Sequence, residues 1–464
     1  MEHWREALAA FRGGEAKYKI LVQAITRDIE NGSLPDGARL PPQRDVGREL
    51  GISVQTVSNA YKELERDGLI RCEVGRGSFV SRNVTEQVSS YMLDHSERSI
   101  ADFSTARIIH TLEHEHAWRD ICAAMSREAD QPWMRDCRPI AGFDRHRAAA
   151  VAWLAHMGVE STPDTVLVTN GAAHAVFLAL ASLVGSDDTV ACEKLTDHGV
   201  IGAAHVLGFT LKGLDIDEYG IRPDHFEDVC ANERISALVC IPNLHNPTGV
   251  VMPEARRRSL VRIAQRYGVY IVEDDVYGPL LDTRPPPLSQ LAPDLGFYCT
   301  SFTKSVMTGL RIGYLSVPTR FALRVNGILR VNSWMATPLM AEVAARWQED
   351  GTAEHLIQIQ RERLAKRHAM VDEILGDYVA WHHPAGLSVW VNVPDHWRTE
   401  TLVGVLRRRG IAVTSPEPFS VRQSHRTKAF RLCVGADIDD DETRRALVEV
   451  RSTFEQYPLA HDFV

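Results

Sequence analysis

The chain has 464 residues, which is too long for one compact core and suits a large domain with a smaller one. Its 52 Lys and Arg residues against 61 Asp and Glu residues give a net charge of −9, which excludes a generally basic protein that coats nucleic acid. Eight scattered cysteines without a C-x-x-C pair argue against a zinc ribbon or a disulfide framework and favour a reducing cytoplasm.

The N-terminal part differs from the rest in its charge balance. Residues 1–82 contain 13 basic and 12 acidic residues, so nearly all of the negative charge lies beyond them. Any contact with nucleic acid is therefore expected at the N-terminus. The first residues are charged and have neither the apolar run nor the cleavage site of a signal peptide, so secretion is not expected.

Three helices and a hairpin are predicted in this first part. Apolar residues follow helical spacing between Ile20 and Ile29, prolines 41 and 42 begin a second helix that stops at Gly51, and Ser53 caps a third. The stretch LIRCEVGRGSFV then alternates strand-like segments around a glycine turn that presents Arg76. This order predicts a winged helix-turn-helix; the alternative is a small helical accessory domain with a solvent-facing hairpin.

The string GARLPPQRDVGRELGISVQTVSNAYKELERDGLIRCEVGRGSFV resembles the GntR type of DNA-binding domain. The resemblance implies contacts with a double-stranded DNA operator from Arg39, Arg44, Ser53, Gln55, Thr56 and Arg76. Val54 stands where such domains often carry arginine, and it offers only apolar contact, for example to a thymine methyl group.

A polar stretch with weak periodicity, residues 83–99, is the expected linker between a DNA-binding domain, residues 1–82, and a larger domain, residues 100–464. Beyond residue 160 the strand-like runs TVLVTN, DTVACE, ALVCIPN, VYIVEDD, FYCTSF and IGYLSV alternate with helical ones. The pattern predicts a mostly parallel sheet covered by helices, with ligands at the strand ends. The apolar stretch TVLVTNGAAHAVFLALASLVG is long enough to cross a membrane, but its TNG turn divides it into a buried strand and a helix.

Polar residues gather after these strands. HNPTG places Asn246 where an amide can bond a ligand oxygen, and EDDVY places Asp274 at a buried end that calls for a cationic partner, either a protonated pyridine or an arginine. Lys304 in SFTK, taken alone, fits a solvated surface charge as well as a covalent anchor. The histidines of HTLEHEH (His110, His114, His116) include an i, i+4 pair that could face a metal, but no further ligand is recognisable in the sequence. A solvated helical face and no metal site are therefore expected.

The ordered set GAA, HNPTG, EDDVY, SFTK and GLRIGY resembles the fold-type I pyridoxal phosphate enzymes of the aminotransferase class, over roughly residues 100 to 460. The resemblance implies a Schiff base between Lys304 and pyridoxal 5'-phosphate. The other implied cofactor contacts are Ala172, Ala173, Asn246, Asp274, Tyr277, Ser301 and Arg311. Arg431 in AFRLCVG would clamp an effector carboxylate, and Asp197 stands where the family has a ring-stacking tyrosine, a role left open between Asp197 and His198.

A GntR-type head on an aminotransferase-like body is the arrangement of the MocR-type transcription regulators. The resemblance implies a cytoplasmic homodimeric regulator, not bound to membranes, that senses a small amino compound through the cofactor. Relatives imply amino acids, amino sulfonates, dipeptides, the cofactor itself or ectoine-derived diamino acids as effectors, and the last is the expected one. The alternative function is an active aminotransferase with a DNA-binding appendage.

Overall fold

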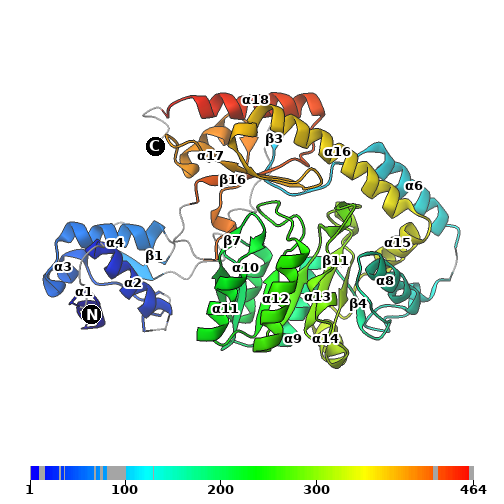
Figure 1. The fold of residues 1–464 in the computed structure, drawn as a ribbon, viewed down its shortest axis with the longest axis horizontal. Coiled ribbons are helices and arrows are strands. Elements are labelled where there is room, and N and C mark those ends of the chain that lie inside the picture. Colours follow the sequence, from blue (N-terminus) through cyan, green and yellow to red (C-terminus); the bar gives the residue numbers. More distant parts are fainter. Residues whose placement is uncertain are drawn as a thin grey trace. The chain divides into compact units, whose positions relative to one another are not determined.

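The computed structural model describes residues 2–9, 16–30, 33–35, 37–66, 69–73, 77–80, 101–128, 130–421 and 427–458. The chain folds as two compact units, residues 1–94 and 95–464, which we call the head and the body (Figure 1). The expected linker, residues 83–99, and Arg76 in the wing lie outside the described residues.

The head is a winged helix-turn-helix, as the sequence predicts. Its elements are α1 (Glu2–Ala9), α2 (Lys17–Glu30), α3 (Gln43–Leu50), α4 (Val54–Arg66), β1 (Ile70–Glu73) and β2 (Gly77–Val80). Gly51 ends α3 in a left-handed conformation (φ 66°), and β1 and β2 pair as an antiparallel hairpin. Helix α1 was not predicted; it packs on α2 because Trp4 is buried and its indole N–H donates to Asp28 Oδ2 at 2.7 Å.

The body is built on a seven-stranded sheet in the order β4-β12-β11-β10-β9-β5-β6. The strands are β4 (Val166–Thr169), β5 (Thr189–Glu193), β6 (Thr210–Leu214), β9 (Ala237–Cys240), β10 (Tyr270–Asp274), β11 (Gly296–Ser301) and β12 (Gly313–Ser316). Only β12 runs antiparallel to its two neighbours. The mostly parallel sheet and its six named runs are therefore confirmed, whereas the edge strand β6 was not predicted.

Helices cover both faces of this sheet (Figure 1). Side chains alternate along β9, where Ala237 and Val239 face one core and Leu238 and Cys240 face the other. The first core is closed by α9 (Ala172–Leu183), α10 (His198–Leu207) and α14 (Ala322–Asn332), and the second by α11 (Pro223–Asn232), α12 (Glu254–Tyr267) and α13 (Leu288–Leu291). The apolar stretch TVLVTNGAAHAVFLALASLVG is divided into β4 and α9, as expected. No described helix is long and apolar enough to cross a membrane.

A smaller part of the body holds a three-stranded antiparallel sheet, β13-β14-β16, and the short pair β15-β3. Its strands are β3 (Ala101–Asp102), β13 (Val379–Trp381), β14 (Ser388–Asn392), β15 (Ile411–Ala412) and β16 (Ala429–Cys433). The remaining helices of the body are α6 (Leu112–Met125), α7 (Pro132–Arg135), α8 (Asp144–His156), α15 (Pro338–Glu349), α16 (Thr352–Leu375), α17 (Thr399–Arg408) and α18 (Asp440–Glu455). Two further strands, β7 (Ile216–Asp217) and β8 (Gly220–Ile221), and short 3-10 turns are also found among the described residues of the body.

The prediction that the three histidines of HTLEHEH form a solvated helical face is wrong for one of them. His110 and His116 are exposed, but His114 is fully buried, and its Nδ1 accepts the Thr111 backbone N–H at 3.2 Å. His114 therefore caps the start of α6 rather than facing solvent. Among the described residues, no group of three or more His, Cys, Asp or Glu side chains is placed to hold a metal ion.

Candidate functional site

The predicted DNA-contacting residues that the structure describes lie at three places in the head: Arg39 before α3, Arg44 in α3, and Ser53, Gln55 and Thr56 at the start of α4. Ser53 precedes α4, and its hydroxyl accepts the Thr56 N–H at 3.1 Å and pairs with Thr56 Oγ1 at 2.7 Å. Gln55, Arg39 and Arg44 are exposed. The Arg39 guanidinium lies against the wing, since a Cβ placed on Gly77 would come within 3.0 Å of its Nε.

In the body, Asp274 ends β10 with an unsatisfied carboxylate. The side chain is 8% exposed, and its Oδ1 is buried without a hydrogen-bond partner among the described residues. Burial, followed by the negative charges of Asp197 and Asp275, raises the pKa of Asp274 to about 8. A carboxylate in this setting gains most from a cationic donor, such as a protonated ring nitrogen.

Lys304 lies in the loop after the neighbouring parallel strand, β11, so it reaches the same sheet edge as Asp274. Its Nζ donates to the backbone carbonyl of Ala106. Burial, aided by the charges of Arg431 and Arg311, lowers the pKa of Lys304 below its ordinary value against the opposing pull of Asp197. A lowered pKa leaves more of the amine neutral and nucleophilic near pH 7.

The start of α9 and the loop after β11 form a cradle of anion-binding groups. Ala172 and Ala173 begin α9, so their backbone N–H groups have no partner four residues earlier in the helix. Gly171, with φ 88°, lets the Arg311 guanidinium approach, since a Cβ there would lie 3.3 Å from Arg311 Nη2. Ser301 is buried beside Thr303, whose Oγ1 is buried and has no hydrogen-bond partner among the described residues. These groups together fit a phosphate.

Asn246 joins two oppositely charged side chains. Its Oδ1 accepts from Arg431 Nη1 at 2.9 Å, and its Nδ2 donates to Asp197 Oδ2 at 2.7 Å. Arg431 is 2% exposed, lies over the Phe419 ring at 4.6 Å and donates to the Ser104 carbonyl at 2.6 Å. The structure thus brings residues from β16, the HNPTG turn and the start of α10 to one point.

Asp197 stands where the sequence resemblance led us to expect a tyrosine. It caps α10 by accepting the Gly199 N–H at 2.7 Å. Burial opposes its ionisation, but His198, the Gly199 N–H, Asn246 and Lys304 outweigh burial and lower its pKa. His198 lies at the side, with its Nδ1 3.8 Å from Asp197 Oδ2. The carboxylate of Asp197, rather than the imidazole, is therefore the group that contacts Asn246.

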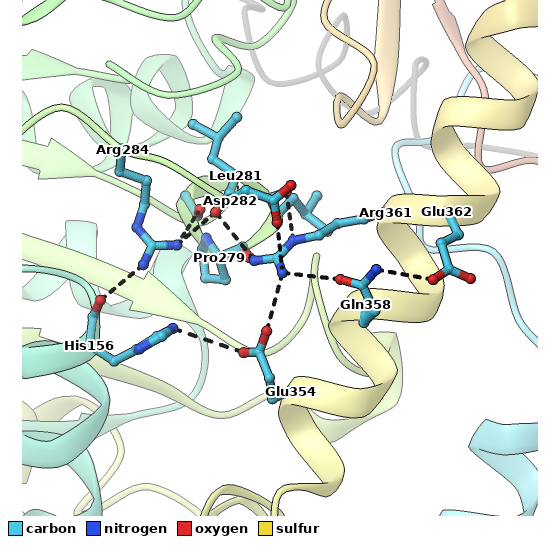
Figure 2. A network of polar contacts seen from close by, with 11 residues as sticks. His156, Pro279, Leu281, Asp282, Arg284, Glu354, Gln358, Arg361 and Glu362 are labelled. Atoms are coloured by element: carbon cyan, nitrogen blue, oxygen red, sulfur yellow. Dashed lines mark hydrogen bonds and ion pairs between the residues drawn. The ribbon is translucent and has the colours of Figure 1, made fainter.

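Tyr277 is placed by the turn that follows it, residues Gly278–Leu280. Figure 2 shows how Arg361 of α16 binds this turn, donating to the carbonyls of Pro279 at 2.9 Å, Leu280 at 3.1 Å and Leu281 at 3.2 Å. Arg284 adds a donor to Leu281 at 2.9 Å. Tyr277 itself is buried, which together with Asp197 raises the pKa of its phenol.

Two contacts at this site, and one hydroxyl that is unpaired among the described residues, were not predicted. The carbonyls of Ser104 and Ala106 meet Arg431 and Lys304, and the hydroxyl of Thr303 adds to the phosphate cradle. Only Thr303 had a signal, because it lies between Ser301 and Lys304 in SFTK. Contacts made by backbone carbonyls cannot be predicted from residue type, because every residue has the same carbonyl group.

The residues fit pyridoxal phosphate on this geometry. The Asp274 oxygen without a partner among the described residues suits the ring nitrogen, the cradle at Gly171 and Arg311 suits the phosphate, and the half-buried amine of Lys304 lies at the same sheet edge.

Comparison with known proteins agrees with the geometry. Residues 110–450, most of the chain, match aminotransferase class I and II. The chain belongs to the aminotransferase class I and II family. Members of this family typically bind pyridoxal phosphate. Residues 17–80 match the bacterial regulatory proteins of the gntR family, a DNA-binding type of domain, so this aminotransferase-family chain has the architecture of MocR-type transcription regulators.

Its relatives include whole regulators of the same architecture. An uncharacterised HTH-type transcriptional regulator of Bacillus subtilis, YdeF, is 27% identical, covering 94% of this chain and 93% of YdeF. The HTH-type transcriptional regulator TauR of Rhodobacter capsulatus is 25% identical over 89% of this chain and 91% of TauR. Among solved structures, kynurenine aminotransferase of Pyrococcus horikoshii superposes with a TM-score of 0.71 at 20% identity, covering 81% of this chain and 94% of that one, which shows the shared fold of the body.

Proposed function

We propose that this MocR-type chain is a cytoplasmic DNA-binding transcription regulator that senses an amino-group-bearing small molecule through pyridoxal phosphate at Lys304. An ectoine-derived diamino acid is the specific effector that we propose. The observation that carries the proposal is that a half-buried amine, Lys304, and the unsatisfied carboxyl group of Asp274 lie at the ends of adjacent strands.

Each residue has a role toward the cofactor. Asp274 would hold the ring nitrogen protonated, and Asn246 and Tyr277 would donate to the ring hydroxyl. The phosphate would be held by a larger set: Ser301, Arg311 and the backbone N–H groups of Ala172 and Ala173. When bound, pyridoxal phosphate supplies an aldehyde carbon to which primary amines attach with loss of water, so that one amine can replace another.

Arg431 is the group that we assign to the effector carboxylate. Its guanidinium is buried and planar, so it can hold a carboxylate with two parallel hydrogen bonds. It is bonded to Asn246 and to the Ser104 carbonyl, while Lys304 is bonded to the Ala106 carbonyl. An effector carboxylate at Arg431 would compete with these contacts to residues 104–106, and this competition supports the proposal that the body changes on effector binding.

The other candidate is an aminotransferase that keeps a DNA-binding appendage. One observation weighs against it: Asp197, bonded to Asn246, occupies the position where the family places a ring-stacking tyrosine. Incubating the loaded protein with an amino acid and a keto acid separates the two functions, since full transamination would favour the enzyme.

A spectral titration tests the sensor function. The purified protein with pyridoxal phosphate should show a visible absorbance band that shifts with one class in a panel of amines. Lys304→Ala should lose both the band and the borohydride-stable link to the cofactor, yet still bind DNA, because the head folds as its own unit. A Lys304→Ala protein that retains the reducible link would contradict the assignment.

We also propose that the regulator acts as a homodimer on a pair of half-sites. One winged head reads only a few base pairs, so specificity in a genome requires two heads on one DNA molecule. Sedimentation should give a dimer at micromolar concentration, and binding should depend on half-site spacing. A monomer, or an affinity indifferent to spacing, would count against the mechanism.

A further inference from the structure

The outward face of α4 carries an unusual set of side chains at its start. The inward face is fixed in the head core by Val57, Ala60, Tyr61 and Leu64, each no more than 1% exposed. The Tyr61 hydroxyl donates to the Pro41 carbonyl at 2.7 Å, which ties α4 to the start of α3. The remaining face is therefore presented rigidly, with Val54, Gln55 and Asn59 exposed on its first two turns.

Val54 is an apolar side chain in a polar setting. It is 46% exposed, and its Cγ2 lies near Gly47, 3.6 Å from where a Cβ on that glycine would be. A β-branched side chain is stiff about χ1, so its methyl groups keep their direction. On base edges in the major groove, the apolar feature is the methyl group of thymine.

Gln55 and Asn59 form a preset amide pair one turn apart. Gln55 Nε2 donates to Asn59 Oδ1 at 3.0 Å, which leaves Gln55 Oε1 to accept and Asn59 Nδ2 to donate. Adenine shows a matching edge, with the N6 donor beside the N7 acceptor. Guanine shows two acceptors there, so one of them would face Gln55 Oε1.

We propose that the start of α4 reads A·T pairs, with Val54 on a thymine methyl group and the Gln55–Asn59 pair on a neighbouring adenine. Residues 54–60 contain no Arg or Lys, the side chains that most often read guanine. This inference rests on the proposed DNA-binding function and adds to it the base pairs that the recognition helix selects.

The test begins with the full-length protein and a random DNA library. The selected half-site should contain adjacent A·T pairs. Replacing its thymines by deoxyuridine one at a time should reveal one position per half-site where the lost methyl group lowers affinity about fourfold. Replacing its adenines by 7-deazaadenine should likewise reveal one position that matters for the wild-type protein and not for Asn59→Ala.

The variants make the assignment specific to α4. Val54→Ala should abolish the deoxyuridine effect without unfolding the head, because Val54 lies outside the core, and Val54→Arg should move the preference to guanine. Val448→Ala, at a 53% exposed valine of α18, is the matched control and should keep the effect. A selected site with G·C pairs under α4, or a flat deoxyuridine scan, overturns the inference alone; no selected site at all overturns the DNA-binding function with it.

Discussion

Asp274→Asn in the cofactor-free protein should change the pH dependence of stability. The wild-type carboxyl has a pKa of about 8, raised from 3.8 mainly by burial. Between these two values the folded protein holds a proton that the unfolded chain has released, so stability falls as the pH rises. The asparagine amide cannot ionise, and the variant should lack this loss.

The size of the effect follows from the width of that window. Each pH unit costs about 1.4 kcal/mol, so raising the pH from 5 to 8 should cost the wild-type protein about 4 kcal/mol through this one group. For a body of this size, such a change corresponds to a fall in Tm of about 5 °C. Above pH 8 the loss should level off, because the folded carboxyl is then ionised as well.

Calorimetric melting at pH 5 and pH 8 measures this directly. Asp274→Asn should show a pH-dependent fall in Tm about 5 °C smaller than that of the wild-type protein. Asp164→Asn, in an exposed loop, is the control and should follow the wild type. Equal losses in Asp274→Asn and the wild type would refute the idea that Asp274 is held unsatisfied in the free protein.

The other predictions concern the head and the turn after Tyr277. Arg44→Ala and Arg76→Ala should each lower the salt slope of operator binding by about 0.9 if each arginine meets one phosphate; an unchanged slope and affinity would place them away from DNA. Trp4→Ala should destabilise the head by about 3 kcal/mol in denaturant titrations, since Trp4 is 2% exposed, whereas Trp118→Ala in the body should leave the head unchanged. Arg361→Ala should destabilise the body by about 3 kcal/mol and weaken cofactor binding measured by absorbance; Arg361→Lys should recover only part, because one ammonium cannot span three carbonyls.

Sequence reasoning succeeded where a pattern repeats or a motif is ordered along the chain. The strands of the main sheet were readable because their apolar runs are short and end at turns, as at Thr169 before Asn170-Gly171. The edge strand β6 was missed because Lys212 and Gly213 break its apolar pattern. Helix α1 was missed because its many charged residues obscure the apolar pattern to which its buried residue, Trp4, belongs.

Within the site, the sequence predicted which residues are present but not which residues contact one another. Asp274 and Lys304 lie at neighbouring strand ends as a parallel sheet requires, although their roles remain proposals. The sequence showed only that Asp197 replaces an aromatic residue. Its roles as a helix cap and as a partner of Asn246 could not be predicted, since Asp197 and Asn246 are 49 positions apart in the chain.

The contacts of Ser104 and Ala106 with Arg431 and Lys304 have a consequence for genetics. Both are made by peptide carbonyls, which nearly every amino acid supplies in the same form. Side-chain substitution at these two positions instead disturbs other contacts, the hydrogen bond of the Ser104 hydroxyl with Asp102 and the packing of the buried Ala106 methyl group, and leaves the two carbonyl contacts themselves untested. Replacing the peptide bond itself by an ester, through hydroxy acids incorporated at positions 105 and 107, weakens the carbonyls of residues 104 and 106 as acceptors and would expose a dependence that conventional mutagenesis passes over.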